Sequence, residues 1–400
     1  MKTLAFYLPQ FHAIPENDEW WGPGFTEWVN VRRATPQFHG HDHPRVPQLL
    51  GEYDLTDPEV GRRQSELAGA NGVDAFCMYF YWFDGQRLLE RPVDAWRERT
   101  DLLPYCLSWA NESWTRRWDG KDREVLAAQE YRPGYARALF DDLLPHFRAS
   151  HYLRHDGRPV LVVHRTDLIP GAGAFAEDMQ SYARDAGFEG LYLVASETKH
   201  GLNSDDFGFD AVAEFPPVGS NTLGSAQLRP VPGLVKGFRG RLMSYRKLAR
   251  AYSDRPSPSF TRHRGVMPGW DNSARRGAHA TIYVGSSPGL YAEWLRRARA
   301  QEQRERGSAG LVFINAWNEW AEGAYLEPDA THGDGYLRAT RPDAAPMAPG
   351  SDVAAGRVGA GHVRSLVLIS GTTVLKYVRK LSFAVKRAVP GRSTELIRKS

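Results

Sequence analysis

The 400-residue sequence predicts an α/β fold, a (β/α)8 TIM barrel that is followed by a linker and a basic amphipathic helix. Eight short apolar runs recur along the first 320 residues. They are near-continuous rather than alternating, as expected of parallel strands that are covered on both faces. Stretches with helical apolar spacing separate them, which is the alternation of a barrel built from βα units. A doubly wound sheet shares this alternation and stays open as the alternative.

The predicted strands cover residues 3–8, 73–81, 104–109, 159–164, 190–196, 209–215, 265–270 and 310–317. Between them, Asp57 followed by Pro58 is typical of a helix N-cap with proline at the first helical position, and this helix is expected to end near Ala70. Helical spacing also predicts helices over residues 135–148, 175–186 and 290–305. We found no repeat with a period of 20–50 residues, which argues against a solenoid or propeller.

The composition changes near residue 340, so we predict a barrel over 1–340, an Ala/Pro/Gly-rich linker over 341–362 and a basic tail over 363–400. Residues 341–400 carry 11 Lys/Arg and 3 Asp/Glu, whereas the rest of the chain is mildly acidic. Val374, Val378, Leu381 and Val385 follow helical spacing. We therefore expect a basic amphipathic helix over 374–389 that either packs on the barrel or contacts an anionic membrane surface.

Charge, cysteine content and hydropathy indicate which partners and which cellular compartment to expect. The acidic body gives no electrostatic reason to bind nucleic acid. Cys77 and Cys106 are the two cysteines, both inside apolar runs, so we expect buried thiols in a reducing compartment. No window approaches 18 consecutive apolar residues, and the N-terminal run is too short for a signal peptide. We expect a cytoplasmic protein, with the basic tail as the candidate for peripheral contact at the inner membrane face.

Aromatic and acidic residues follow the predicted strands, where a barrel builds its active site. Ten of the 12 tryptophans lie in or beside these loops: Trp20, Trp21, Trp28, Trp82, Trp109, Trp114, Trp118, Trp270, Trp317 and Trp320. A flat ring packs against the C–H face of a sugar while carboxylates and amides bond its hydroxyls. Any single tryptophan can equally fill barrel packing, but the clustering favours a glycan substrate.

Glu319 and Glu322 are the candidate catalytic pair. Three residues apart on a turn or first helical turn, they are expected to point the same way. Glycosidic bond cleavage needs one group that protonates the leaving oxygen and another that supplies or activates a nucleophile. Crowding of two carboxylates raises one pKa and keeps that group protonated near neutral pH. Glu112 follows another strand in the same Asn-Glu context, so a Glu112–Glu319 pair is the alternative.

No metal and no cofactor are predicted. His39, His41 and His43 alternate along one segment, but this spacing suits an extended loop and no further ligand set can be identified from the sequence. The glycines of residues 171–176 lie several residues beyond a predicted strand, whereas a dinucleotide loop begins at its end. The sequence has no P-loop and no Asp-x-Asp motif.

Several motifs in order resemble the WbsX-like family, which is similar to glycoside hydrolase family 99. They are residues 5–12 (AFYLPQFH), 20–28 (WWGPGFTEW), 109–118 (WANESWTRRW) and 315–323 (NAWNEWAEG). The resemblance covers about residues 1–340. For the hydrolases it rests mainly on Glu-Trp-x-Glu-Gly-x-x-x-Glu-Pro, here Glu319 through Pro328. Here Ala324-Tyr325-Leu326 replaces the hydrolases' usual Thr-Gln-Ile, so the resemblance does not carry their mannose specificity to this chain.

The resemblance implies a (β/α)8 barrel and a retaining mechanism without a glycosyl-enzyme bond. Glu319 would take the proton of the sugar's own 2-hydroxyl, whose oxygen attacks the anomeric carbon, and Glu322 would act as acid and then as base. The candidate substrate-binding residues are Tyr7, Gln10, His12, Glu27, Trp28, Tyr81, Trp82, Trp109, Asn111, Glu112, Trp114, Trp270, Asp271, Trp317, Asn318 and Trp320.

The sequence thus predicts a retaining glycosidase that acts on a bacterial surface polysaccharide or its precursor. Two alternatives stay open. One is a glycosyltransferase of lipopolysaccharide, O-antigen or capsular polysaccharide biosynthesis, which is how the WbsX-like family has often been labelled. The other is a glycan-binding barrel without catalysis.

Overall fold

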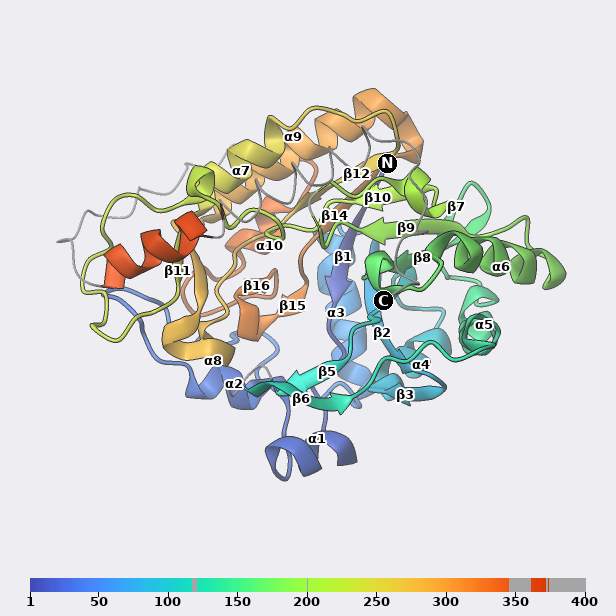
Figure 1. The fold of residues 1–400 in the computed structure, drawn as a ribbon, viewed down its shortest axis with the longest axis horizontal. Helices are drawn as coiled ribbons and strands as arrows, with labels where there is room; N and C mark the ends of the chain where they lie inside the picture. The colour runs from blue at the N-terminus through green and yellow to red at the C-terminus, as the bar shows by residue number, and fades with distance from the viewer. Residues whose placement is uncertain (117–120, 200, 345–360, 372, 374–400) are drawn as a thin grey trace, which may run out of the picture.

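The computed structural model describes residues 1–116, 121–199, 201–344, 361–371 and 373, and it confirms the predicted barrel (Figure 1). Eight parallel strands form one closed sheet, because β1 pairs both with β2 and with β14. This closure excludes a doubly wound sheet, whose edges stay open. The barrel strands are β1 (Lys2–Tyr7), β2 (Ala75–Phe83), β4 (Tyr105–Trp109), β8 (Arg158–Val163), β9 (Tyr192–Ser196), β10 (Ala211–Ala213), β12 (Arg262–Val266) and β14 (Leu311–Ile314).

Helices surround the barrel, with α5 and α6 at the right of Figure 1 and α7 and α9 at its top. Their bounds are α3 (Pro58–Ala70), α4 (Glu90–Arg97), α5 (Tyr135–Phe147), α6 (Ala172–Asp185), α7 (Tyr245–Ser253), α9 (Pro288–Arg306) and α10 (Gly335–Ala339). The predicted start of α3 is confirmed, since the Asp57 carboxylate accepts a hydrogen bond from the Glu59 backbone N–H at 2.9 Å. The other three predicted helices are α5, α6 and α9.

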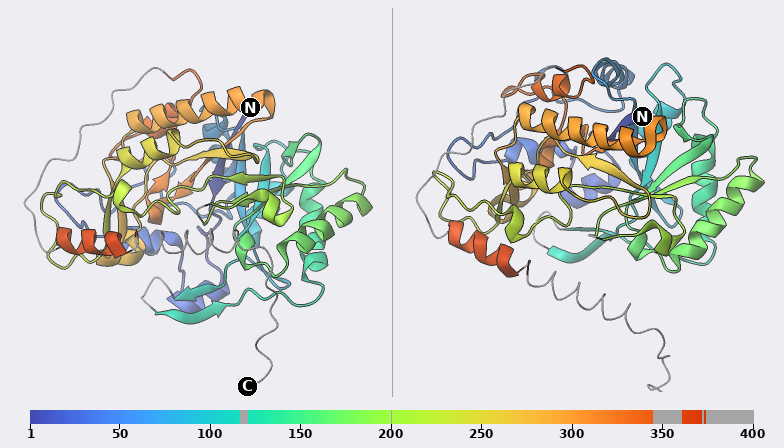
Figure 2. Two further views of the ribbon diagram at one scale, coloured as in Figure 1. Left: turned by 45° about the horizontal axis from the view of Figure 1, so that its top comes forward. Right: turned by 90° about the horizontal axis from the view of Figure 1, so that it is seen from above.

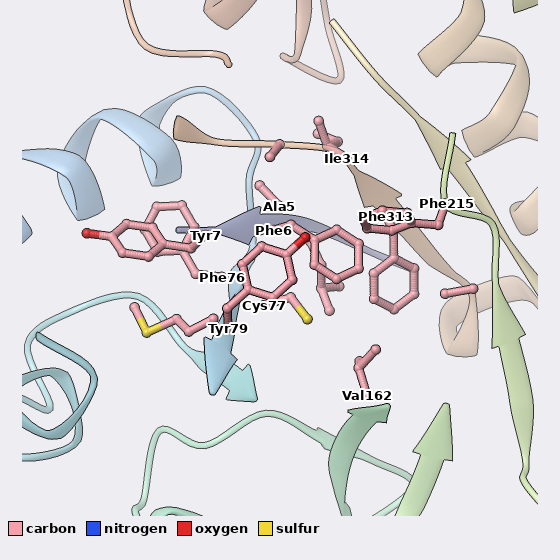
Figure 3. Packing of buried hydrophobic residues seen from close by; sticks show 14 of the residues in the cluster. Ala5, Phe6, Tyr7, Phe76, Cys77, Tyr79, Val162, Phe215, Phe313 and Ile314 are labelled. Carbon is pink, nitrogen blue, oxygen red and sulfur yellow. The ribbon is translucent and has the colours of Figure 1, made fainter. Parts of the chain in front are cut away.

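The barrel interior is filled by large aromatic side chains (Figure 3). The Phe6 ring lies 5.0 Å from that of Phe215 and 5.8 Å from those of Tyr79 and Phe313. Such packing makes the interior a solid core rather than a pore. Cys77 and Cys106 are buried free thiols in this core, as expected.

One strand was predicted out of position. The seventh apolar run covers residues 265–270, but β12 begins at Arg262 and ends at Val266. Its first three residues are arginine or histidine, and all three are buried against acids: Arg262 and Arg264 against Glu214, and His263 against Glu302. Because buried ion pairs replace apolar contacts here, a search for apolar runs finds only the end of the strand.

Shorter helices and strands lie outside the eight barrel strands. The helices are α1 (Pro15–Trp21), α2 (Glu27–Arg33) and α8 (Ser273–Arg276). The short strands are β3 (Gln86–Leu88), β5 (Trp114–Arg116), β6 (Lys121–Ala127), β7 (Arg154–His155), β11 (Arg241–Ser244), β13 (Thr281–Val284), β15 (Asn318–Glu319) and β16 (Ala324–Tyr325). The 3-10 helices are η2 (Thr166–Leu168), η3 (Ser204–Phe207), η4 (Leu223–Ser225), η5 (Gly277–His279), η6 (Gly307–Ala309) and η7 (Trp320–Glu322).

Residues 361–371 form a helix, drawn in red beside β11 in Figures 1 and 2. It buries the side chains of His362, Ser365 and Ile369. The helix begins inside the predicted linker, whereas residues 345–360 and the predicted helix 374–389 lie outside the described residues. The domain boundary at residue 340 stays a prediction. Across the described parts of the chain, no helix combines the length and the apolar character that crossing a bilayer requires.

Candidate active site

Glu319 and Glu322 lie in a tight turn that follows β14, at the C-terminal end of the barrel. β15 and β16 pair as an antiparallel ladder, and η7 forms the connection between them. The turn closes at Gly323, which has a φ of 60° and would bring a Cβ within 2.8 Å of the Arg45 guanidinium. Both carboxylates thereby face the same cavity.

Arg275 joins the two carboxylates. Its NH1 donates to Glu322 Oε1 at 2.6 Å and its NH2 to Glu319 Oε2 at 3.2 Å. The guanidinium also contacts Glu27, with Nε 3.2 Å from Oε2 and NH2 3.1 Å from Oε1. Glu27 is fully buried at the start of α2. One cation therefore holds three acidic side chains, which fixes the candidate pair relative to each other.

Burial and crowding change the proton affinity of the pair. Burial, opposed by Arg275 and reinforced by the charge of Glu322, raises the pKa of Glu319 to about 8. Burial also raises the pKa of Glu322, again against Arg275. With a pKa of about 8, Glu319 keeps its proton at neutral pH, which avoids two like charges around one cation. A pair that carries one proton can serve as one acid and one base.

The cavity around the pair has a volume of about 410 Å3 and is walled by rings and a few polar groups. Its aromatic residues are Trp21, Tyr79, Tyr81, Trp114, Phe215 and Trp270, and its polar residues include Gln10, Glu112, Ser113 and His164. Burial lowers the pKa of His164 to about 4, so this imidazole is neutral at neutral pH. Rings together with a few hydrogen-bonding groups match the faces and hydroxyls of a sugar.

The cavity brings together five of the predicted substrate-binding residues with the pair. These are Gln10, Tyr81, Glu112, Trp114 and Trp270. Glu112 forms an ion pair with Arg165, a partner separate from Arg275. A carboxylate with its own counter-ion is suited to bonding sugar hydroxyls, and less suited to the alternative role as partner of Glu319 in catalysis.

Six other predicted aromatics do not line this cavity but pack below or beside it: Tyr7, Trp28, Trp82, Trp109, Trp317 and Trp320. All six are buried, and five of them direct their polar atom to an internal partner. Tyr7 OH donates to Gln64, Trp28 Nε1 to the Tyr53 carbonyl, Trp82 Nε1 to Asp142, Trp109 Nε1 to the Trp82 carbonyl, and Trp320 Nε1 to Glu327. Trp118 lies outside the described residues.

Two predicted polar residues, Asn318 and Asn111, bond the barrel framework, and a third, His12, is buried. Asn318, in β15, bonds both the N–H and the carbonyl of Leu8, and so fastens the turn after β14 to the end of β1. Asn111 makes the same pair of bonds to the backbone of Arg165. His12 is 1 % exposed, below the cavity surface. Asparagine amides that replace strand hydrogen bonds have a structural role. Substrate contact by Asn318, Asn111 and His12 stays a prediction.

Asp271 lies outside the cavity of the pair and belongs to a different cluster. Its Oδ2 accepts from His41 Nε2 at 2.8 Å, from His43 Nε2 at 2.7 Å and from Arg45 at 2.7 Å. Burial alone would raise the pKa of Asp271, but Arg45 and the two imidazoles hold it well below the usual range. The cluster adjoins a second cavity of about 320 Å3 that shares Trp270 with the first.

His41, His43 and Asp271 are close enough to one another to resemble a metal site, a grouping that the sequence analysis did not identify. The hydrogen bonds do not fit metal binding. The Gln37 backbone N–H donates to His41 Nδ1 at 3.0 Å, so neutral His41 carries its proton on Nε2 and has no lone pair there for a metal. Asp271 Oδ2 already accepts three donors. This cluster is therefore a hydrogen-bonded clamp between two loops.

Sequence reasoning missed Arg275 and His164 as site residues. Arg275 lies in a run of two arginines on α8, where nothing local distinguishes it from the exposed Arg276. The sequence could have indicated a cation here, because three acids at one end of the barrel require a counter-ion. His164 directly follows β8, which is the position where barrel strands present catalytic residues.

A family model described as glycosyltransferase WbsX matches residues 3–340. Two curated relatives, both named uncharacterized protein WxcX and from two strains of Xanthomonas campestris pv. campestris, are 46% identical over 341 residues. The match covers 84% of this chain and 49% of each relative. The chain thus spans about half the length of the curated relatives it matches.

Solved structures support the fold. A glycoside hydrolase-like protein matches with a TM-score of 0.54 at 15% identity, over 85% of this chain and 92% of that chain. The GH99 endo-alpha-mannosidase of Bacteroides thetaiotaomicron matches with a TM-score of 0.52 at 14% identity, over 84% of this chain and 95% of that chain. At this identity the match shows a shared barrel fold.

Proposed function

The chain belongs to the glycosyltransferase WbsX family, and from its candidate site we propose that it is a carbohydrate-active enzyme, specifically a retaining glycosidase. The observation that carries the proposal is the pair Glu319 and Glu322, buried around one guanidinium in the wall of an aromatic cavity. Its substrate would be a bacterial surface polysaccharide or the precursor of one.

We propose that the sugar's own 2-hydroxyl is the nucleophile. Glu319 takes its proton while O2 attacks the anomeric carbon, and Glu322 gives its proton to the departing glycosidic oxygen. Water then opens the 1,2-anhydro sugar, with Glu322 as base and Glu319 returning the proton to O2. Two inversions give net retention. In the free protein the pKa of Glu319 is the one raised to about 8, so substrate binding has to move the shared proton to Glu322.

The proposed reaction is tested by a product assay on two substrate pools. One pool holds oligosaccharides and polysaccharides in water, and the other holds nucleotide sugars with acceptors. We expect new saccharide ends in the first pool, seen by mass spectrometry, and their loss in Glu319→Gln. Transfer in the second pool alone would instead support the glycosyltransferase that the family description suggests. Binding without turnover in either pool would favour a glycan-binding barrel.

The roles within the pair are separated by leaving-group dependence, once a cleaved linkage is known. Glu322→Gln should abolish turnover of substrates with poor leaving groups and should spare activated aryl glycosides more than Glu319→Gln does, because an aryl oxide departs without a proton. The reverse pattern would exchange the two roles. Unchanged activity of both variants would remove the pair from the mechanism.

A further inference from the structure

Exposed aliphatic side chains concentrate in two segments that are hydrogen-bonded to each other. The described residues include 11 exposed large hydrophobics, and six of them lie in two segments, the loop 223–238 and the helix 361–371. We call this set the helix–loop patch, and it consists of Leu223, Leu228, Val235, Val363, Val367 and Leu368. Leu228 is 58% exposed and Val367 66%. A cluster of this kind marks an interaction surface more often than scattered exposed residues do.

The two segments of the patch are held together. His362 Nε2 lies 3.1 Å from the Leu228 carbonyl oxygen, near the start of the helix. The Leu223 N–H donates to Thr373 Oγ1 at 3.0 Å, on the C-terminal side of residues 361–371. The helix thus contacts residues 223 and 228 of the loop, and Figure 1 shows it on the outside of the molecule beside β11. Val363 and Val367 lie one turn apart, so both face outward.

The charge of these segments has a single sign. Residues 215–253 contain seven Lys/Arg and no Asp/Glu, although the body of the protein is mildly acidic. Residues 353–394 also contain no Asp/Glu, and residues 372–400 carry eight Lys/Arg against one acid. Within the patch, Arg229, Lys236, Arg239 and Arg364 are exposed between the aliphatic residues. The face is therefore apolar and basic together.

We propose that the helix–loop patch docks the protein onto an anionic phospholipid bilayer, with the aliphatic side chains at the acyl boundary and the basic ones at the headgroups. An amphipathic helix whose polar residues are basic binds such a surface by burial of apolar area and by attraction to anionic lipid. A nucleic acid would use the basic residues but leave the aliphatic ones without a role. The proposal is independent of the proposed reaction.

Vesicle co-sedimentation of the full chain tests the docking surface. We expect binding to vesicles of phosphatidylcholine mixed with phosphatidylglycerol, weak binding to phosphatidylcholine alone, and release by high salt. Val367→Glu should weaken binding by about tenfold or more, because it removes buried apolar area and adds a repelled charge. Lys236→Glu should weaken binding by about fivefold or more. Neither residue is near the proposed active site, so glycan turnover should stay unchanged.

Two matched variants serve as controls. Val125→Glu changes another exposed valine, in β6, and Arg304→Glu reverses an exposed arginine on α9. Both should bind vesicles like the wild type. Equal binding to both kinds of vesicle would overturn the proposal. Anionic-vesicle binding that Val367→Glu and Lys236→Glu leave intact would assign the contact to residues 374–400 instead. Binding to soluble DNA but not to vesicles would identify a nucleic-acid surface.

Discussion

Arg275 determines what the candidate pair can do. Its guanidinium contacts Glu27, Glu319 and Glu322, so three acids share one cation. If all three acids were ionised, the group would carry an excess of two negative charges in a buried site, which favours retention of one proton. Glu27 contacts Nε and NH2 of the guanidinium, beside Glu319, and anchors it. Arg275 is thus a positioning residue that also sets the proton affinity of the pair.

Replacement of Arg275 should change the pH profile as well as the rate. Arg275 lowers the pKa of both Glu319 and Glu322, so its loss raises both values. Activity needs one proton on the pair, and the alkaline limb of kcat/KM in the wild type should lie near the Glu319 pKa of about 8. In Arg275→Gln we expect both limbs to move to higher pH and kcat to fall about 100-fold.

The neighbouring Arg276→Gln is the matched control, because Arg276 is exposed on the same short helix. It should retain the wild-type profile. A rate loss in Arg275→Gln with both limbs in place would show that Arg275 acts only through the structure of the site.

Residue types near the site could be predicted from the sequence, but the direction of each side chain could not. Glu319, Glu322 and Trp270 were predicted at strand ends, and they line the cavity. Trp82 and Trp109 satisfied the same criterion, yet both are buried, with Trp109 bonded to the Trp82 carbonyl. Successive strand residues point to opposite faces, so an error of one residue in register reverses the expectation.

The eight strands were predictable as elements because each one is buried on both sides. Their apolar runs are near-continuous, and each run overlaps a barrel strand. The exception in position, β12, is built from buried Arg–Glu and His–Glu contacts that no apolar pattern reveals. Long-range pairing decides such cases, and one sequence contains no local sign of it.

Two loops meet at Asp271, and their junction supports the site. The loop that carries His41, His43 and Arg45 contacts Asp271, and four residues further along lies Arg275. The Asp271 carboxylate also accepts the Ser273 N–H at 2.9 Å, at the start of α8. The clamp therefore fixes the short helix that presents Arg275 to the pair.

Asp271→Ala should destabilise the protein by about 3–5 kcal/mol, because Arg45 would stay buried without its counter-ion. Urea unfolding measures this free energy, and kcat/KM should fall with it as α8 loses its support. If Asp271→Ala does not fold, Asp271→Asn keeps the size and should show the same direction.

The exposed ion pair at Asp254 is the control for this prediction. Asp254 is 55% exposed beside Arg250, and Asp254→Ala should change the unfolding free energy by less than about 1 kcal/mol. An Asp271→Ala effect no larger than that of Asp254→Ala would contradict the clamp.

Across the whole molecule, the barrel combines a well-packed interior with buried acids at one end, where burial makes their ionisation unfavourable. The pKa of the buried Glu327 is raised to about 7 by burial, against hydrogen bonds from Trp320, Gln64 and Tyr53. The pKa values of Glu319 and Glu322 are raised as well. The folded protein with these carboxyl groups is less stable than it would be with neutral side chains of the same shape at these positions. Functional sites commonly reduce the stability of the fold that carries them in this way.

That cost predicts a pH-dependent gain in stability for Glu319→Gln. The folded pKa of Glu319 is about 8 and the unfolded value about 4.5, so the folded state binds more protons than the unfolded state between these values. The Glu319 contribution to stability is therefore complete below about pH 4.5 and is lost as the pH rises to about 8. Buried histidines such as His164, with a folded pKa of about 4, act in the opposite direction and stabilise as the pH rises. The wild-type curve mixes both effects, but the difference between variant and wild type isolates Glu319.

We expect the unfolding free energy of Glu319→Gln to exceed that of the wild type by an amount that grows from pH 5 to pH 8 and reaches the order of a few kcal/mol. Urea titrations at several pH values measure it, with exposed Glu59→Gln as the control that should show no such growth. A constant difference across this range would mean that Glu319 ionises as freely in the folded protein as in the unfolded chain, and the pair could not then hold a proton at neutral pH.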